Sequence, residues 1–293
     1  MEEAQYYHNI FHLSVPYPLP ILQFLKQKLQ LGKRYAIMEV HTHNGQWSKL
    51  LLNHVHLVCS LCTDPSYQVY LKKELASASN FLSLNALPIL TNIDDDSIDC
   101  LFVDETFNQY AVEGMQQEFE RILRLNSYVL LTYNERFGLP NSFTAAYLKF
   151  LEEQTAVGTI SLPQKEQLNT FYKHSYAKEV FNNQQRLTWT QLEQYFLTQL
   201  EEQQLEPDEW QIKQLRLLFE AYNTEGKVIL SYRTHLYYGI FNYSVSEISL
   251  PKNIFFTLLR PFAFVFYILL KANIYFWKGI RWLKTALSSK SSS

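Results

Sequence analysis

Short apolar runs alternate with helix-like segments over the first half of the chain. The apolar runs, of strand length, occupy residues 35–40, 55–62, 81–84, 98–103 and 128–133. Between them, segments with apolar residues at helical spacing occupy 21–31, 46–52, 67–78 and 112–123, whereas residues 6–20 are aromatic, proline-containing and irregular. Strands and helices that alternate with short connections imply right-handed crossovers and a parallel sheet. The pattern therefore predicts a doubly wound, mostly parallel α/β domain.

The pattern changes after residue 140. Residues 141–225 are polar, rich in Gln and Glu, and mainly helical in periodicity, which predicts a helical cap inserted into the α/β domain. Residues 227–241 return to a strand pattern and predict the closing strands of the sheet. We therefore expect an α/β domain of residues 1–140 and 226–247, a cap of residues 141–225, and a separate tail of residues 248–293.

The tail is basic and apolar, while the rest of the chain is acidic. From residue 250 onward there are seven basic residues and no acidic ones, although the whole chain carries a net charge of −2. Its longest uncharged apolar run, residues 261–270, is well short of the roughly 20 residues that span a bilayer. Trp277 and Trp282 are typical interfacial anchors. These features predict an amphipathic helix on an anionic membrane surface. A kinked insertion through Arg260-Pro261 and packing against the protein itself or a partner remain alternatives.

Composition narrows the function further. The 47% hydrophobic content argues against global disorder, and an acidic body disfavours nucleic acid as a partner. The N-terminus has neither a basic segment nor an apolar one of the secretory type, so we expect a cytoplasmic protein that associates peripherally with membranes. Cys59 and Cys62 have CxxC spacing but lie in an apolar run, which is typical of buried strand cysteines. The sequence does not indicate an oligomeric state.

Three polar segments follow the first three predicted strands. Residues 37–45 combine a buried strand, Glu39, and a tight turn that ends at Gly45 before a helix. Asp64 follows the second strand, and Asn85 and Ala86 follow the third. The carboxyl ends of parallel strands meet at one edge of a sheet, where an acidic residue after the second strand can accept hydrogen bonds from ribose hydroxyls. The spacing therefore predicts a nucleotide-type cofactor site.

These segments, together with several others, resemble the motifs of class I S-adenosylmethionine (SAM)-dependent methyltransferases. Residues 39–45 resemble the D/E-x-G-x-G-x-G motif of that family, and residues 15–18 resemble its RPxYP element. Further similar segments follow in order at residues 87–99, 106–110, 118–123 and 133–136. The resemblance covers about residues 5–241, and the pattern is most similar to small-molecule methyltransferases of the trans-aconitate type.

The resemblance implies a seven-stranded Rossmann-like sheet, SAM as the cofactor, and a small or lipid-like methyl acceptor. The positions that it implies for cofactor binding are Glu39, His41, His43, Gly45, Asp64, Asn85, Ala86 and Thr106. The positions that it implies, more weakly, for the acceptor are Tyr17, Asn108, Tyr110, Tyr133 and Asn134. The resemblance does not identify a catalytic residue.

Two histidines depart from the family pattern. His41 and His43 replace the first two motif glycines, which let the backbone approach the methionine part of SAM. Two hypotheses follow: a methyltransferase acting at a membrane surface, or a catalytically inactive pseudo-methyltransferase that serves as a membrane-attached binding or scaffold protein. With His54 and His56 the histidines also suggest a metal site, but no acidic or cysteine residues accompany them at recognised ligand spacing. We therefore expect no metal.

Overall fold

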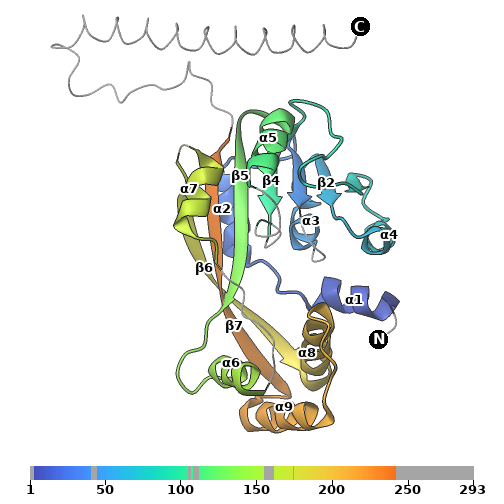
Figure 1. Cartoon of the computed structure of the whole chain (residues 1–293), viewed down its shortest axis with the longest axis vertical. Helices are drawn as coiled ribbons and strands as arrows, with labels where there is room; N and C mark the ends of the chain where they lie inside the picture. The colour runs from blue at the N-terminus through green and yellow to red at the C-terminus, as the bar shows by residue number, and fades with distance from the viewer. Residues whose placement is uncertain are drawn as a thin grey trace, which may run out of the picture. The chain divides into compact units, whose positions relative to one another are not determined.

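The computed structural model of the chain describes residues 3–40, 45–104, 107, 112–154, 162–173 and 175–241, which lie in one compact unit that ends at residue 244. Figure 1 shows how strands and helices alternate along it. The strands are β1 (Ala36–Val40), β2 (Leu57–Leu61), β3 (Phe81–Leu84), β4 (Ile98–Val103), β5 (Leu123–Arg136), β6 (Ala177–Thr188) and β7 (Lys227–Ile240). The helices are α1 (Glu3–Leu13), α2 (Leu19–Lys28), α3 (Gln46–Leu51), α4 (Pro65–Glu74), α5 (Val112–Ile122), α6 (Phe143–Gln154), α7 (Lys165–Tyr172), α8 (Trp189–Glu202) and α9 (Glu209–Tyr222).

The strands form one seven-stranded sheet in the order β3-β2-β1-β4-β5-β7-β6. The first five strands in this order pair in parallel, whereas β7 runs antiparallel to both β5 and β6. Helices α3, α4 and α5 connect β1 to β2, β2 to β3 and β4 to β5, because neighbouring parallel strands need a crossover, whereas the segment 85–97 between β3 and β4 contains no helix. The prediction of a doubly wound, mostly parallel α/β sheet of the Rossmann-like methyltransferase type is confirmed.

Helices cover both faces of the sheet. One apolar cluster joins α2 and α3 to one face, and a second joins α5 and α7 to the other. Every residue of β1 is buried, as expected for a central strand that is covered on both sides. This double coverage explains why the central strands read as nearly continuous apolar runs in the sequence.

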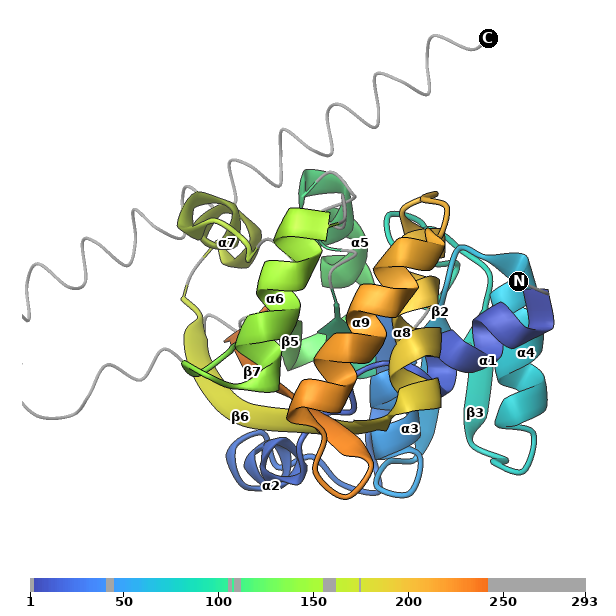
Figure 2. The ribbon, with the colours of Figure 1, turned by 90° about the horizontal axis from the view of Figure 1, so that it is seen from below.

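A third apolar cluster lies where β6 and β7 extend beyond the parallel strands. There α6, α8 and α9 pack against the two long strands, through residues that include Phe196, Leu215 and Leu230. Figure 2 shows these three helices lying side by side. We call α6, α8 and α9 the helical cap. It lies within the segment that we predicted to be mainly helical.

The sequence interpretation was wrong for residues 6–20, since the first part of this segment forms helix α1. Tyr7, Ile10 and Phe11 are buried and lie at the i, i+3, i+4 spacing of one helix face. Aromatic residues are weak helix formers, so the segment gave no helix signal of its own. The prolines that follow then favoured the interpretation of the whole segment as irregular. The helix is stabilised by its contacts with α4 and α8 rather than by its own propensity.

Strand β6 was also missed, because it lies inside the segment predicted to be mainly helical. It is the edge strand of the sheet, and most of its residues are exposed or half-buried. Its polar sequence therefore lacks an apolar run, although polar residues are common on edge strands. Consequently β7 alone occupies the segment predicted to form the closing strands. Strand β5 is also longer than the predicted 128–133, and Asn126 (φ 63°) adopts the left-handed conformation within it.

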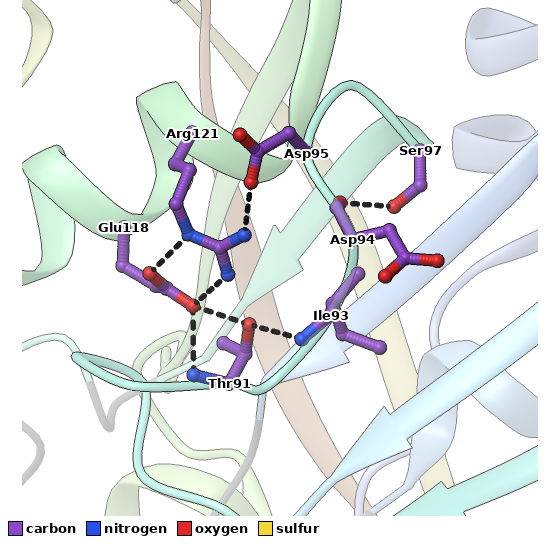
Figure 3. A network of polar contacts seen from close by, with 7 residues as sticks. All are labelled: Thr91, Ile93, Asp94, Asp95, Ser97, Glu118 and Arg121. Atoms are coloured by element: carbon purple, nitrogen blue, oxygen red, sulfur yellow. Dashed lines mark hydrogen bonds and ion pairs between the residues drawn. The ribbon is translucent and has the colours of Figure 1, made fainter.

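A buried carboxylate ties α5 to the loop before β4 (Figure 3). One Glu118 oxygen accepts hydrogen bonds from the Thr91 backbone nitrogen (2.7 Å) and hydroxyl (2.5 Å). Arg121 donates to both oxygens of Glu118 and also pairs with Asp95. The hydrogen bonds from Arg121, opposed by burial and aided by Thr91, lower the pKa of Glu118 to about 2. The family-like segment 118–123 therefore has a structural role.

The tail predicted for residues 248–293 lies outside the described residues. Among the helices that the structure describes, none combines the length and apolar character needed to cross a bilayer.

Candidate functional site

The carboxyl ends of four parallel strands line up at one edge of the sheet. Val40 of β1 pairs with Leu61 of β2 and with Val103 of β4, and Leu61 pairs in turn with Leu84 of β3. The segments that follow these four residues therefore share one edge. In open α/β sheets, ligands bind in the crevice outside this edge. We call it the carboxyl edge.

Glu39 lies at the carboxyl edge, but its carboxylate binds the first turn of α3. It accepts hydrogen bonds from the backbone nitrogens of Trp47 (2.9 Å) and Ser48 (2.8 Å) and from the Ser48 hydroxyl (2.6 Å). Burial raises the pKa of Glu39 to about 7, although the three hydrogen bonds oppose this rise. Glu39 thus holds the start of α3, the helix that follows the turn expected to approach the cofactor.

Gly45 precedes α3 in the left-handed conformation (φ 55°), as expected for a turn glycine. A Cβ atom at this position would lie 3.4 Å from Leu71 and 3.6 Å from the Phe11 ring. The Phe11 carbonyl also accepts hydrogen bonds from the side chains of Gln46 (3.1 Å) and Lys49 (2.8 Å). Helix α1 therefore packs directly on Gly45 and the beginning of α3.

Asp64 caps helix α4 and also binds helix α1. Its Oδ1 atom accepts hydrogen bonds from the backbone nitrogens of Ser66 (2.9 Å) and Tyr67 (3.1 Å), which is a normal N-cap arrangement. Its Oδ2 atom accepts a hydrogen bond of 2.8 Å from the Tyr7 hydroxyl. The carboxylate implied to bind the ribose is therefore held by its own chain on both oxygens.

Asn85 and Ala86 extend the carboxyl edge beyond β3. Asn85 is exposed, whereas Ala86 is half-buried against the core. Gln68 of α4 donates to the carbonyls of Cys62 and Leu84, and so joins the ends of β2 and β3. This bridge fixes the point at which the segment 85–86 leaves the sheet.

The implied acceptor residues are spread over several elements of the same edge. The buried ring of Tyr17 stacks on Trp47, with the centroids 4.0 Å apart. Tyr133 is buried near the end of β5. The Asn134 side chain accepts a hydrogen bond of 2.7 Å from the Thr234 hydroxyl of β7. Trp47, at the start of α3, also donates to the Thr132 hydroxyl of β5 (3.2 Å), so the Tyr17–Trp47 stack lies against β5.

Five implied site residues lie outside the described residues: His41, His43, Thr106, Asn108 and Tyr110. Within the described part of the chain, no group of three or more His, Cys, Asp and Glu residues could hold a metal ion. Cys59 and Cys62 are buried, free thiols, as predicted from their apolar surroundings. Burial raises the pKa of the Cys59 thiol to about 11 and that of Cys62 to about 12, so neither is a reactive thiolate.

Sequence reasoning missed three residues of the carboxyl edge. Tyr7 and Phe11 come from a helix that was not predicted, and they reach the edge through tertiary packing alone. Asp104 is buried directly after β4, and its backbone nitrogen donates to the Val40 carbonyl (3.3 Å). The signal for Asp104 was present, since an acidic residue at the end of a buried strand is also what drew attention to Glu39.

Sequence comparisons identify no relatives, because no protein-family model and no curated protein matches the chain. Solved structures do match. A candidate type II methyltransferase from Anaeromyxobacter dehalogenans superposes with a TM-score of 0.53 at 10% identity, over 78% of this chain and 99% of that chain. The YcgJ protein from Bacillus subtilis superposes with a TM-score of 0.48 at 10% identity, over 78% of this chain and 100% of that chain.

A third solved structure is a phosphoethanolamine N-methyltransferase from Haemonchus contortus in complex with S-adenosylhomocysteine. Its TM-score is 0.46 at 13% identity, over 82% of this chain and 57% of that chain. At such low identity the likeness concerns the fold alone. The chain therefore has a methyltransferase-like fold, and its activity has to be argued from the site.

Proposed function

We propose that this protein is a SAM-dependent methyltransferase that acts on a small or lipid-like acceptor. The proposal is supported above all by the carboxyl edge, where Glu39, Gly45 and Asp64 follow strands β1 and β2 in a sheet of methyltransferase order. Asp64 would bind the ribose hydroxyls, Asn85 and Ala86 would lie along the adenine, and the turn before Gly45 would approach the methionine part.

Methyl transfer depends mainly on positioning. Bound SAM would supply an electrophilic methyl group; its transfer to an acceptor lone pair, in line with the carbon–sulfur bond, would break that bond and leave S-adenosylhomocysteine. The protein has to hold the acceptor in that line and exclude water, and such alignment alone lowers the barrier substantially. The Tyr17–Trp47 stack and Tyr133 near the end of β5 are buried, so they would support the side chains that hold the acceptor.

Calorimetric titration with SAM and S-adenosylhomocysteine tests this function. We expect saturable binding of both, and weaker binding when Asp64 is replaced. Absence of binding at millimolar ligand would contradict the enzyme hypothesis. In that case the double variant His41→Gly/His43→Gly is the matched experiment, since it restores the two motif glycines and should rescue binding if the imidazoles block the methionine end.

A non-catalytic function is the alternative, and one observation favours it. Both oxygens of Asp64 accept hydrogen bonds from the chain itself, one of them from Tyr7, so most of the acceptor capacity of the carboxylate implied to bind the ribose is already used. A pseudo-methyltransferase that serves as a binding or scaffold protein would never need to free the Asp64 carboxylate from these hydrogen bonds. The same titration distinguishes the two functions. A non-catalytic protein should bind neither SAM nor S-adenosylhomocysteine, both as the wild type and as the His41→Gly/His43→Gly variant.

We also propose that the basic, apolar tail attaches the protein to anionic membranes. The charge asymmetry supports this, since seven basic and no acidic residues follow residue 249. Co-sedimentation with vesicles that contain phosphatidylserine should depend on residues 250–293 and weaken with salt. Equal sedimentation of the chain truncated after residue 249 would refute the proposal, and neutral vesicles provide the control.

A further inference from the structure

Arg136, the last residue of β5, forms no direct ion pair with a carboxylate in the described part of the chain. Its Nη2 atom donates to the Tyr195 hydroxyl (2.8 Å), and its Nε atom is inaccessible to solvent and has no hydrogen-bond partner. Among the described residues, no carboxylate oxygen lies within 4.0 Å of the guanidinium. Burial raises the pKa of Glu202, at the end of α8, to about 6, and the electrostatic attraction of Arg136 partly opposes this rise, but the two side chains lie beyond ion-pair distance. Removing a guanidinium from water in this way is costly unless an anion pairs with it.

The surroundings of Arg136 are aromatic hydroxyls rather than charges. Its guanidinium carbon lies 6.0 Å from the centre of the Tyr147 ring and 5.7 Å from that of Tyr195. The Tyr195 and Tyr232 hydroxyls are 3.3 Å apart. Burial raises the pKa of both Tyr147 and Tyr232, so these phenols stay protonated and add no negative charge at neutral pH. The cluster has ring faces and hydroxyls, and among the described residues no carboxylate pairs directly with its guanidinium, since Glu202 acts on Arg136 only from beyond ion-pair distance.

This cluster borders the carboxyl edge. Tyr147 comes from α6, Tyr195 from α8 and Tyr232 from β7, so the helical cap and the long antiparallel strand meet around Arg136. The side-chain nitrogen of Gln185 donates to the carbonyl of Leu13, the last residue of α1 (2.7 Å). The side-chain oxygen of Gln185 accepts a hydrogen bond from the Tyr232 hydroxyl. Helix α1 lies between α4 and α8 in both views (Figures 1 and 2). The cluster thus lies on the cap side of α1, while Asp64 binds α1 from the side of α4.

We propose that Arg136, with Tyr195 and Tyr232, forms a binding site for the oxyanion group of a small ligand, a carboxylate or a phosphate. A half-buried guanidinium has several N–H donors in a planar fork that matches such groups, and the Nε–H of Arg136 has no acceptor among the described residues. The Tyr195 and Tyr232 hydroxyls would flank the bound group, although the Tyr232 proton is already donated to Gln185. The inference rests on the proposed function and deepens it, since it makes the methyl acceptor an anionic molecule that is anchored on the cap side of the edge.

The test is binding of two simple oxyanions, inorganic phosphate and citrate, to the full chain at constant ionic strength. We expect saturable calorimetric binding of at least one of them. Arg136→Met should raise its Kd about tenfold or more, because the only fixed positive charge of the cluster is removed. Arg216→Met is the matched control: Arg216 also lies over an aromatic ring, that of Trp189, but pairs with Glu220 and should show an unchanged Kd.

Two further variants separate recognition from packing. Tyr195→Phe keeps the ring and removes the hydroxyl that accepts from Arg136, so the Kd should rise about 2- to 10-fold even if Arg136→Met does not fold. Arg136→Lys keeps the positive charge but loses the planar set of guanidinium donors, so it should bind the anion more weakly than the wild type does. No binding of either anion, or equal binding by the wild type, Tyr195→Phe and the arginine variants, overturns the inference.

S-adenosylhomocysteine distinguishes failure of this inference from failure of the proposed function. Arg136→Met should bind it as the wild type does, because Arg136 lies apart from Asp64. Anion binding that depends on Arg136, without binding of S-adenosylhomocysteine to any variant, would leave the anion site standing and refute the methyltransferase. The opposite pattern would leave the methyltransferase and refute the anion site.

Discussion

Replacement of Glu39 by alanine should lower the free energy of unfolding by about 3–4 kcal/mol. The substitution leaves the backbone nitrogens of Trp47 and Ser48 and the Ser48 hydroxyl without their acceptor, and both residues are completely buried. Buried donors that lose their partner each cost about 1–3 kcal/mol. Urea unfolding at a fixed pH measures the change.

The same carboxylate makes stability depend on pH. Burial raises the pKa of Glu39 from 4.5 to about 7, so the folded protein retains a proton that the unfolded chain has already lost in this range. The contribution of Glu39 to stability is therefore fully present below pH 4.5 and is lost as the pH rises through about 7. Glu39→Gln should remove this slope and cost less than alanine, since the amide keeps one acceptor.

An exposed glutamate provides the control for these variants. Glu153 of α6 is paired only with Lys149 at 3.6 Å on the surface, and its replacement by alanine should change stability by less than about 0.5 kcal/mol. A loss of under about 1 kcal/mol for Glu39→Ala would show that water or a backbone shift replaces the lost acceptor, contrary to the expectation.

The elements that the sequence predicted best are those with a single burial pattern. Strand β4 has the predicted bounds and β1 differs by one residue, because buried parallel strands are short apolar runs. Strand β3 also has the predicted bounds, although it is an edge strand with a single buried residue. Helix α5 likewise shows its apolar face through Met115, Phe119 and Ile122. Where the local pattern and the tertiary environment agree, periodicity is sufficient.

The elements that the sequence missed depend on distant partners. Helix α1 packs against α4 and α8, which are far from it in sequence. Strand β6 is stabilised by pairing with β7, and its own sequence shows no apolar strand pattern. Non-local contacts of this kind leave little trace in a short window of sequence. The site follows the same rule. Spacing predicted that Asp64 lies at the carboxyl edge, but it did not predict the hydrogen bond from the Tyr7 hydroxyl, 57 residues away, to the Asp64 carboxylate.

Asp64 and Tyr7 should affect cofactor binding in opposite directions. A ribose hydroxyl that approaches Asp64 meets an Oδ2 atom that already accepts a hydrogen bond from Tyr7. Tyr7→Phe removes the competing donor and should lower the Kd for S-adenosylhomocysteine about 2- to 10-fold. Asp64→Ala removes the ribose acceptor itself and should raise that Kd at least about tenfold.

Stability gives a second readout that does not require a cofactor. Asp64→Ala loses the N-cap of α4 and leaves the buried Tyr7 without its acceptor, so the free energy of unfolding should fall by about 2–3 kcal/mol. Tyr7→Phe should cost about 1 kcal/mol. Tyr70→Phe is the control, because Tyr70 also lies between α1 and α4 but contacts Glu74 and His8 instead of Asp64.

The comparison of these variants decides what helix α1 does at the edge. If Tyr7→Phe weakens cofactor binding as much as Asp64→Ala does, Tyr7 orients the carboxylate for the ribose, and the idea of competition is wrong. If it tightens binding while Tyr70→Phe has no effect, α1 occupies part of the ribose site in the cofactor-free protein. Cofactor would then have to displace the Tyr7 hydroxyl, and the affinity measured for the wild type would include the cost of breaking that hydrogen bond.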